Sequence, residues 1–77
     1  MSSVTVNLYA AFRSLIDGQP SVVVEIDEGE TIEQLLLELG VPIEEARIIF
    51  CNNRIVDVTH PLSGGESVGV FPAIGGG

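Results

Sequence analysis

The sequence contains no lysine and no tryptophan, and it has one cysteine and one histidine. A single cysteine cannot form an intrachain disulfide, a multi-cysteine metal cluster or the ligand set of an iron–sulfur centre. His60 precedes a proline and has no second histidine or nearby cysteine to complete a metal site or a catalytic triad. Cys51 ends an apolar stretch, where a cysteine is typically a core residue. The composition therefore gives little support to an enzyme.

Basic residues are scarce as well. Three arginines stand against eleven acidic residues, which gives a formal net charge of -8. This charge opposes binding to nucleic acid or to an anionic membrane surface. It favours a protein partner with a basic face, although an acidic surface that serves only solubility explains the composition equally well. The carboxylates lack the spacing of a calcium loop, so we expect them to form a solvated charged face.

Long apolar runs are also absent. The first ten residues have neither the basic start nor the apolar run of a signal peptide, and no stretch approaches the length of a membrane span. Because a lone cysteine suits a reducing compartment, we expect a cytoplasmic protein with no membrane contact. A chain of 77 residues has material for one core. We expect a single domain over residues 1–72 and a flexible tail over residues 73–77.

The residues that are present predict two paired strands at the start of the chain. Apolar and polar residues alternate in VTVNLY, which is the pattern of a half-buried strand. The β-branched segment Ser21–Ile26 predicts a second strand, paired with the first as a hairpin. Between them, residues 10–18 predict a short helix or turn. Its inward-facing side chains are expected to be Phe12, Leu15 and Ile16.

The best-defined element is a helix that begins after Thr31. Thr31 and Gln34 have the spacing of a capping box, and Gly40 stands where a left-handed C-terminal cap is needed. Apolar residues recur at helical spacing and share one stripe: Ile32, Leu35, Leu36 and Leu39. In so small a chain, we expect this stripe to pack on a sheet rather than to bind a ligand.

Further strands are predicted after the helix. Residues 47–51 read as an apolar strand, residues 52–53 as a tight turn and residues 54–56 as the returning strand. Ser67–Pro72 alternates again and predicts the last strand. The order predicts an α+β fold, in which one main helix packs on one face of a mixed sheet of four to five strands.

The last seven residues, FPAIGGG, offer the clearest chemistry. A carboxylate is a poor electrophile, and conversion to an acyl-adenylate with ATP is the usual way to make it react. An activating enzyme must draw the chain end into a narrow channel that excludes water, where only glycine lets the backbone approach closely. Phe71, Pro72 and Ile74 are predicted to form an apolar docking anchor, with completion of the core as the alternative for Phe71 and Ile74.

The segment IFCNNRIVDVTHPLSGGESVGVFPAIGGG resembles, without a gap, the C-terminal half of the MoaD/ThiS family of ubiquitin-like sulfur carriers. The likeness is greatest to the small subunits of molybdopterin synthase, whose strand ends in V-N and whose later motifs are P-L, D-G-D/E-x-V and F-P-P-V-x-G-G. The matching positions here are Cys51-Asn52, Pro61-Leu62, residues 64–68 and the tail. Gly64 replaces an acidic residue and Ala73 replaces the second proline of that pattern.

The resemblance implies a β-grasp, ubiquitin-like fold and the role of a protein substrate rather than an enzyme. It implies that an E1-like, MoeB-type enzyme uses ATP to adenylate the carboxylate of Gly77, which then becomes a thiocarboxylate. It implies that Gly76 is the second functional residue and that Phe71 is a hydrophobic contact. Sulfur would then pass to a pterin precursor in a MoaE-type large subunit of molybdopterin synthase. No bound cofactor and no metal are implied.

Three alternatives remain open. A carrier for thiamin or another sulfur-containing metabolite shares the fold and the Gly-Gly end. A ubiquitin-like modifier would join the same carboxylate to lysines of other proteins, although this chain has no lysine for self-linked chains. The third alternative is an interaction module with an inert tail.

Overall fold

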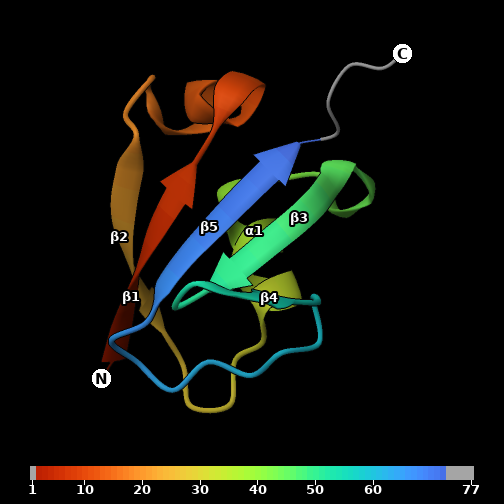
Figure 1. Cartoon of the computed structure of the whole chain (residues 1–77). Coiled ribbons are helices and arrows are strands. Elements are labelled where there is room, and N and C mark those ends of the chain that lie inside the picture. The colour runs from red at the N-terminus through yellow and green to blue at the C-terminus, as the bar shows by residue number, and fades with distance from the viewer. Residues whose placement is uncertain (1, 73–77) are drawn as a thin grey trace.

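The computed structural model describes residues 2–72, which form a five-stranded mixed sheet with a helix on one face (Figure 1). Its strand order is β2-β1-β5-β3-β4. The elements are β1 (Ser2–Leu8), η1 (Ala10–Ile16), β2 (Ser21–Ile26), α1 (Ile32–Leu39), η2 (Ile43–Glu45), β3 (Ala46–Cys51), β4 (Arg54–Val56) and β5 (Ser67–Pro72), where η denotes a 3-10 helix. The predicted α+β arrangement is confirmed.

The sheet is mixed because β1 and β5 run parallel at its centre. β1 pairs with β2 as the predicted antiparallel hairpin, and β3 pairs antiparallel with both β4 and β5. Asn52 and Asn53 join β3 to β4 with φ angles of 53° and 70°. Positive φ at both central residues is the requirement of the type I′ turn, whose twist matches that of the paired strands.

Helix α1 covers one face of this sheet and closes the core. The fully buried residues of the helix and of the central strands belong to one cluster, with Val41 and Leu62 from the connecting segments. The predicted stripe of α1 faces this cluster, with Leu39 only partly buried. Cys51 is 5% exposed and belongs to the cluster as expected. Burial of apolar surface at this interface is the main source of stability in so small a domain.

One inward-facing prediction is wrong. Phe12 is buried and Ile16 packs against the core, but Leu15 is 42% exposed. The segment is a short 3-10 helix beyond the end of β1, at the rim of the sheet (Figure 1). At this rim one side of the segment meets the core through Phe12 and Ile16, and Leu15 lies on the solvent side.

The N-terminal end of α1 is capped as the sequence predicts. The Thr31 hydroxyl accepts a hydrogen bond from the N–H of Gln34, and the Gln34 side chain accepts one from the N–H of Thr31 at 2.9 Å. The N–H groups of Ile32 and Glu33 donate to the carbonyls of His60 and Val58. The loop after β4 therefore satisfies donors that a helix start leaves free. No helix within residues 2–72 is long and apolar enough to cross a membrane.

Thr31→Ala removes one half of the capping box. We expect it to lower the free energy of unfolding by about 1 kcal/mol, because an N–H of the first turn loses its acceptor. Chemical denaturation followed by circular dichroism measures the change. Ser21→Ala, at an exposed strand position, is the control, and an equal loss in both variants would contradict a specific contribution of the cap.

Candidate functional site

The predicted site residues are the last two residues of β5 and three residues that follow β5 in the sequence. Phe71 and Pro72 are half-buried and are the last described residues of the chain. The remaining predicted residues, Ile74, Gly76 and Gly77, lie outside the described residues, as does the predicted tail 73–77. β5 lies between β1 and β3, so the chain continues toward this tail from the middle of the sheet (Figure 1).

Phe71 lies on the open face of the sheet, opposite α1. Its neighbour Val70 is fully buried in the core, and successive side chains of a strand point to opposite faces. Its cross-strand partner Ile48 is 42% exposed, which agrees with a solvent-facing position. Of the two interpretations left open for Phe71, completion of the core is therefore wrong.

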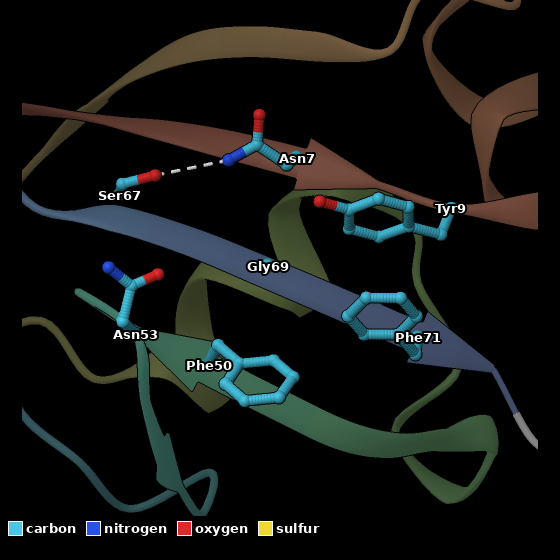
Figure 2. Close-up of a pocket in the computed structure, with 7 residues that line it drawn as sticks. All are labelled: Asn7, Tyr9, Phe50, Asn53, Ser67, Gly69 and Phe71. Atoms are coloured by element: carbon cyan, nitrogen blue, oxygen red, sulfur yellow. Dashed lines mark hydrogen bonds between the residues drawn. The ribbon is translucent and has the colours of Figure 1, made fainter.

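Three aromatic rings from neighbouring parts of the sheet form a cluster around Phe71 (Figure 2). The Tyr9 ring stacks on the Phe71 ring with a centroid distance of 4.0 Å and an interplanar angle of 4°. The Phe50 ring meets Phe71 edge-on at 5.7 Å and 77°. Offset or edge-on aromatic pairs add stability beyond their buried area. The cluster is therefore a firm apolar surface at the base of the tail.

A hollow of about 270 Å³ opens beside this cluster. Figure 2 shows its lining, which consists of Asn7, Tyr9, Phe50, Asn53, Ser67, Gly69 and Phe71. Gly69 lies in the middle strand, and a Cβ atom at this position would lie 3.6 Å from the Tyr9 ring and 3.8 Å from the Cβ of Phe50. These are ordinary contact distances, so the missing side chain leaves the space open.

Polar groups line one side of the hollow. The Asn7 amide donates to the Ser67 hydroxyl at 3.1 Å and to the Val68 carbonyl at 3.4 Å. Asn53 contributes a further amide at the β3–β4 turn. Aromatic walls with a few polar groups at the margin are typical of a small recognition site.

Exposed apolar side chains extend the surface beyond the hollow. Ile55 is 73% exposed and pairs with Phe50, which in turn pairs with Gly69. Directly opposed residues of neighbouring strands share a face of the sheet. We call Tyr9, Ile48, Phe50, Ile55, Gly69 and Phe71 the open-face patch. An exposed apolar patch of this kind typically marks a protein interaction surface.

Arg13 places a positive charge at the edge of the open-face patch. Its Nε donates to the carbonyl of Leu8 at 2.9 Å, and its guanidinium carbon lies 5.7 Å from the centre of the Tyr9 ring. A guanidinium near an aromatic face is held by cation–π attraction. Arg13 therefore helps to fix Tyr9 in its stacked position.

Cys51 and His60 are the other groups that the sequence analysis considers, and both lie within the described residues. Burial, together with the negative charge of Glu66, raises the pKa of the Cys51 thiol, which suppresses the reactive thiolate. The His60 carbonyl accepts a hydrogen bond from the N–H of Ile32 at the start of α1, and its side chain is a minor contributor to the lowered pKa values of Asp57 and Glu66, behind the hydrogen bonds that these carboxylates accept. Within residues 2–72, no three histidine, cysteine or acidic side chains are grouped to hold a metal ion.

Sequence reasoning missed most of the open-face patch. The sequence identifies only Phe71, whereas Tyr9 follows β1, Phe50 lies in β3 and Gly69 lies in β5, and the three meet only in the folded sheet. A signal was nevertheless present. Tyr9 and Phe50 stand at positions where the alternation of buried residues calls for a polar side chain. Aromatic residues at solvent-facing strand positions are a sign of binding rather than of folding.

Comparison with solved structures identifies the fold. The small archaeal modifier protein 1 of Haloferax volcanii superposes with a TM-score of 0.80 at 15% identity, covering 96% of this chain and 100% of that chain. A chain from the complex of subunits 1 and 2 of the molybdopterin-converting factor of Helicobacter pylori 26695 gives a TM-score of 0.62 at 17% identity, with coverage of 97% and 99%. These likenesses confirm the β-grasp fold.

A third structure is also similar in sequence. It is a Pyrococcus furiosus protein assigned as molybdopterin converting factor subunit 1, with a TM-score of 0.76, 27% identity and coverage of 96% of this chain and 100% of that chain. No curated protein gives a significant match to the sequence. The model of the ThiS family, by contrast, matches residues 6–77. Because that match covers all but the first five residues, the chain belongs to the ThiS family of ubiquitin-like sulfur carriers.

Proposed function

We propose that the protein is the sulfur carrier subunit of a molybdopterin synthase and that its partners dock on the open-face patch. Members of the MoaD/ThiS family are noncatalytic sulfur carriers. The observation that carries the choice of pathway is the 27% identity to the Pyrococcus furiosus protein assigned as molybdopterin converting factor subunit 1, over nearly the whole of both chains. The Pro61-Leu62 and Phe71-Pro72 motifs support the same choice.

In this proposal, the reacting group is the carboxylate of Gly77, and the family match extends to that residue. The carboxylate oxygen attacks the α-phosphorus of ATP in an E1-like, MoeB-type enzyme, and pyrophosphate leaves. Hydrosulfide then displaces AMP and forms the thiocarboxylate on Gly77; where the sulfur donor is a persulfide, the acyl disulfide that forms is cleaved by a second thiol, which releases the thiocarboxylate. Gly76 and Gly77 provide a chain without side chains for the narrow channels of both partner enzymes. ATP is a substrate of the activating enzyme, and the carrier itself holds no cofactor or metal.

The open-face patch is proposed as the surface that brings the tail to its partners. The patch adjoins the point where residues 73–77 follow β5, so a partner seated on it lies close to the start of the tail. Phe71 and Pro72, with Ile74 beyond the described residues, form the anchor at this point. The hollow over Gly69 has a volume of about 270 Å³ and aromatic walls, so it has room for an apolar side chain that a partner would insert as a hot spot.

The same surface serves two partners in turn. The activating enzyme and the MoaE-type large subunit must each receive the same chain end, so one carrier cannot occupy both at once. The net charge of -8 favours partners with a basic face and accelerates each encounter. A cytoplasmic location, a folded unit over residues 1–72 and a flexible tail over residues 73–77 are part of the proposal.

The chemistry of the tail is tested by intact-mass spectrometry after incubation with the activating enzyme, ATP and a sulfur donor. We expect a mass increase that corresponds to replacement of one oxygen by sulfur. Gly77→Ala should abolish the increase, because a methyl group at the reacting residue blocks the channel. Gly75→Ala, at a position that varies in the family pattern, is the matched control and should react. Equal loss in both variants would contradict the assignment of Gly76 and Gly77.

The docking surface is tested by filling the hollow. Gly69→Val should weaken binding to the activating enzyme and to the large subunit by at least about tenfold, because a hot-spot pocket is lost. Gly69→Ala is the matched control, since its Cβ meets only ordinary contacts. Tyr9→Ala, which removes one wall, should also weaken binding. Isothermal titration calorimetry measures the affinities, and circular dichroism checks the fold. Unchanged affinity in folded Gly69→Val and Tyr9→Ala would place docking elsewhere.

A ubiquitin-like modifier is the second candidate. The superposition with small archaeal modifier protein 1 motivates it, although at 15% identity the likeness is one of fold. A modifier would use the same carboxylate to form an isopeptide bond with a lysine of another protein. Digestion of cell proteins would then yield lysines that carry a Gly-Gly remnant. A carrier for thiamin synthesis would instead pass its sulfur to a thiazole precursor.

A further inference from the structure

One carboxylate is buried on the side of the molecule away from the open-face patch. Glu30 is 5% exposed and is the buried charged side chain of residues 2–72. Its Oε1 accepts a hydrogen bond from the N–H of Asp27 at 2.9 Å. Its Oε2 is buried without a hydrogen-bond partner. A buried carboxylate oxygen without a partner costs free energy, so the site calls for a group that satisfies it. The expectation of a solvated charged face is therefore wrong at this residue.

The surroundings of Glu30 are acidic. It lines a hollow of about 370 Å³ between the turn after β2 and helix α1, together with Asp27, Glu28, Gly29, Gln34, Leu37 and Glu38. The Gln34 carbonyl oxygen already accepts from Thr31, and the charged neighbours of Glu38 are Glu30 and Asp27. From the loop after β4, Leu62 donates its N–H to the main-chain carbonyl of Glu30 rather than to the carboxylate. The hollow is thus lined by carboxylates.

Glu38 offers the missing partner. Its side chain is exposed and lines the same hollow as Glu30, where the Glu30 carboxylate and a hydrogen bond to it raise the pKa of Glu38. Ionised carboxylates only accept hydrogen bonds, so a hydrogen bond between two of them requires one proton. We propose that Glu30 and Glu38 share a proton in the folded protein, with Glu38 as donor to Oε2 of Glu30, and that this pair fastens the β2–α1 turn to the last turn of α1.

The electrostatics of the pair give the sign of its pH dependence. The negative charge of Glu30, followed by burial and the hydrogen bond to Glu30, raises the pKa of Glu38 above its ordinary value. The folded state therefore binds this proton more tightly than the unfolded state. The resulting stability is fully present below the ordinary glutamate pKa of about 4.3 and is lost as the pH rises through the raised value.

Two other carboxylates give the stability the opposite pH dependence, because their pKa values are lowered. Hydrogen bonds from Thr59 lower the pKa of Asp57. Burial opposes ionisation of Glu66, but the N–H groups of Ser63 and Gly64 outweigh it and lower its pKa. His60, in the same loop, favours ionisation of both. The stability from Asp57 and Glu66 is present above the ordinary values and is lost as the pH falls. The fold should therefore be most stable in mild acid, between these two ranges.

The proton is located by NMR titration of the side-chain carboxyl carbons in the full chain. We expect the midpoint of Glu38 to lie above the ordinary glutamate value, and Glu30→Gln to return it toward that value because the negative neighbour is removed. Glu25→Gln, which removes one exposed charge from β2, is the control and should leave the midpoint in place. An ordinary midpoint in the unaltered protein would overturn the shared proton.

Thermal unfolding provides a second, independent test. The melting temperature should rise as the pH is lowered from neutrality toward the ordinary glutamate pKa of about 4.3, because Glu38 takes up its proton over that interval. Glu38→Gln should lose this rise and melt higher than the unaltered protein at pH 7.5, because its amide can donate to Glu30 without a proton. The same pH dependence in Glu38→Gln would overturn the proposal. A divalent cation is the alternative partner of the pair. If MgCl2 or CaCl2 at constant ionic strength stabilised the unaltered protein at pH 7.5 but not Glu38→Gln, a cation would bridge the two carboxylates, and the shared proton would be overturned.

Discussion

The parallel pairing of β1 with β5 is the interaction on which the rest of the structure depends. It aligns Val6 with Val68 and Leu8 with Val70, and all four side chains are fully buried against α1. The first and last strands of the sheet are thereby joined at its centre, and the core cannot close until both are in place. The same pairing brings Tyr9, just after β1, beside Phe71 near the end of β5. One ladder of hydrogen bonds thus builds both the core and the proposed docking surface.

One face of the sheet stabilises the fold, and the other is the proposed recognition surface. The face under α1 buries aliphatic side chains, and the capped helix with its loop-bound N–H groups leaves little there for a partner. The open face carries rings, a glycine and exposed isoleucines, and it includes Phe71, the residue before the last of β5. In the proposed function, this small carrier contributes a surface and a reactive chain end, and its partners contribute the active sites.

The sequence predicts the features that rest on local rules. Helix α1 with its capping box, the alternating strands and the Asn52-Asn53 turn follow from periodicity and capping chemistry, and the motifs after Ile49 predict the family. Leu15 was misplaced because periodicity does not say how far the core extends. The hollow over Gly69 and the burial of Glu30 depend on contacts between distant segments, which no local pattern contains. The roles of Gly76 and Gly77 stay predictions, since both lie beyond the described residues.

The central claim is that this carrier delivers sulfur to a pterin precursor in the synthesis of molybdopterin. Its most direct test is a single-turnover assay in which the thiocarboxylated protein is mixed with a MoaE-type large subunit and the pterin precursor. The account predicts that sulfur leaves the carrier, that its terminal carboxylate is regenerated and that the precursor gains the sulfur. The account would be contradicted if the thiocarboxylate remained on the carrier in that mixture. It would also be contradicted if a parallel mixture with a thiazole-forming enzyme and its precursor released the sulfur instead.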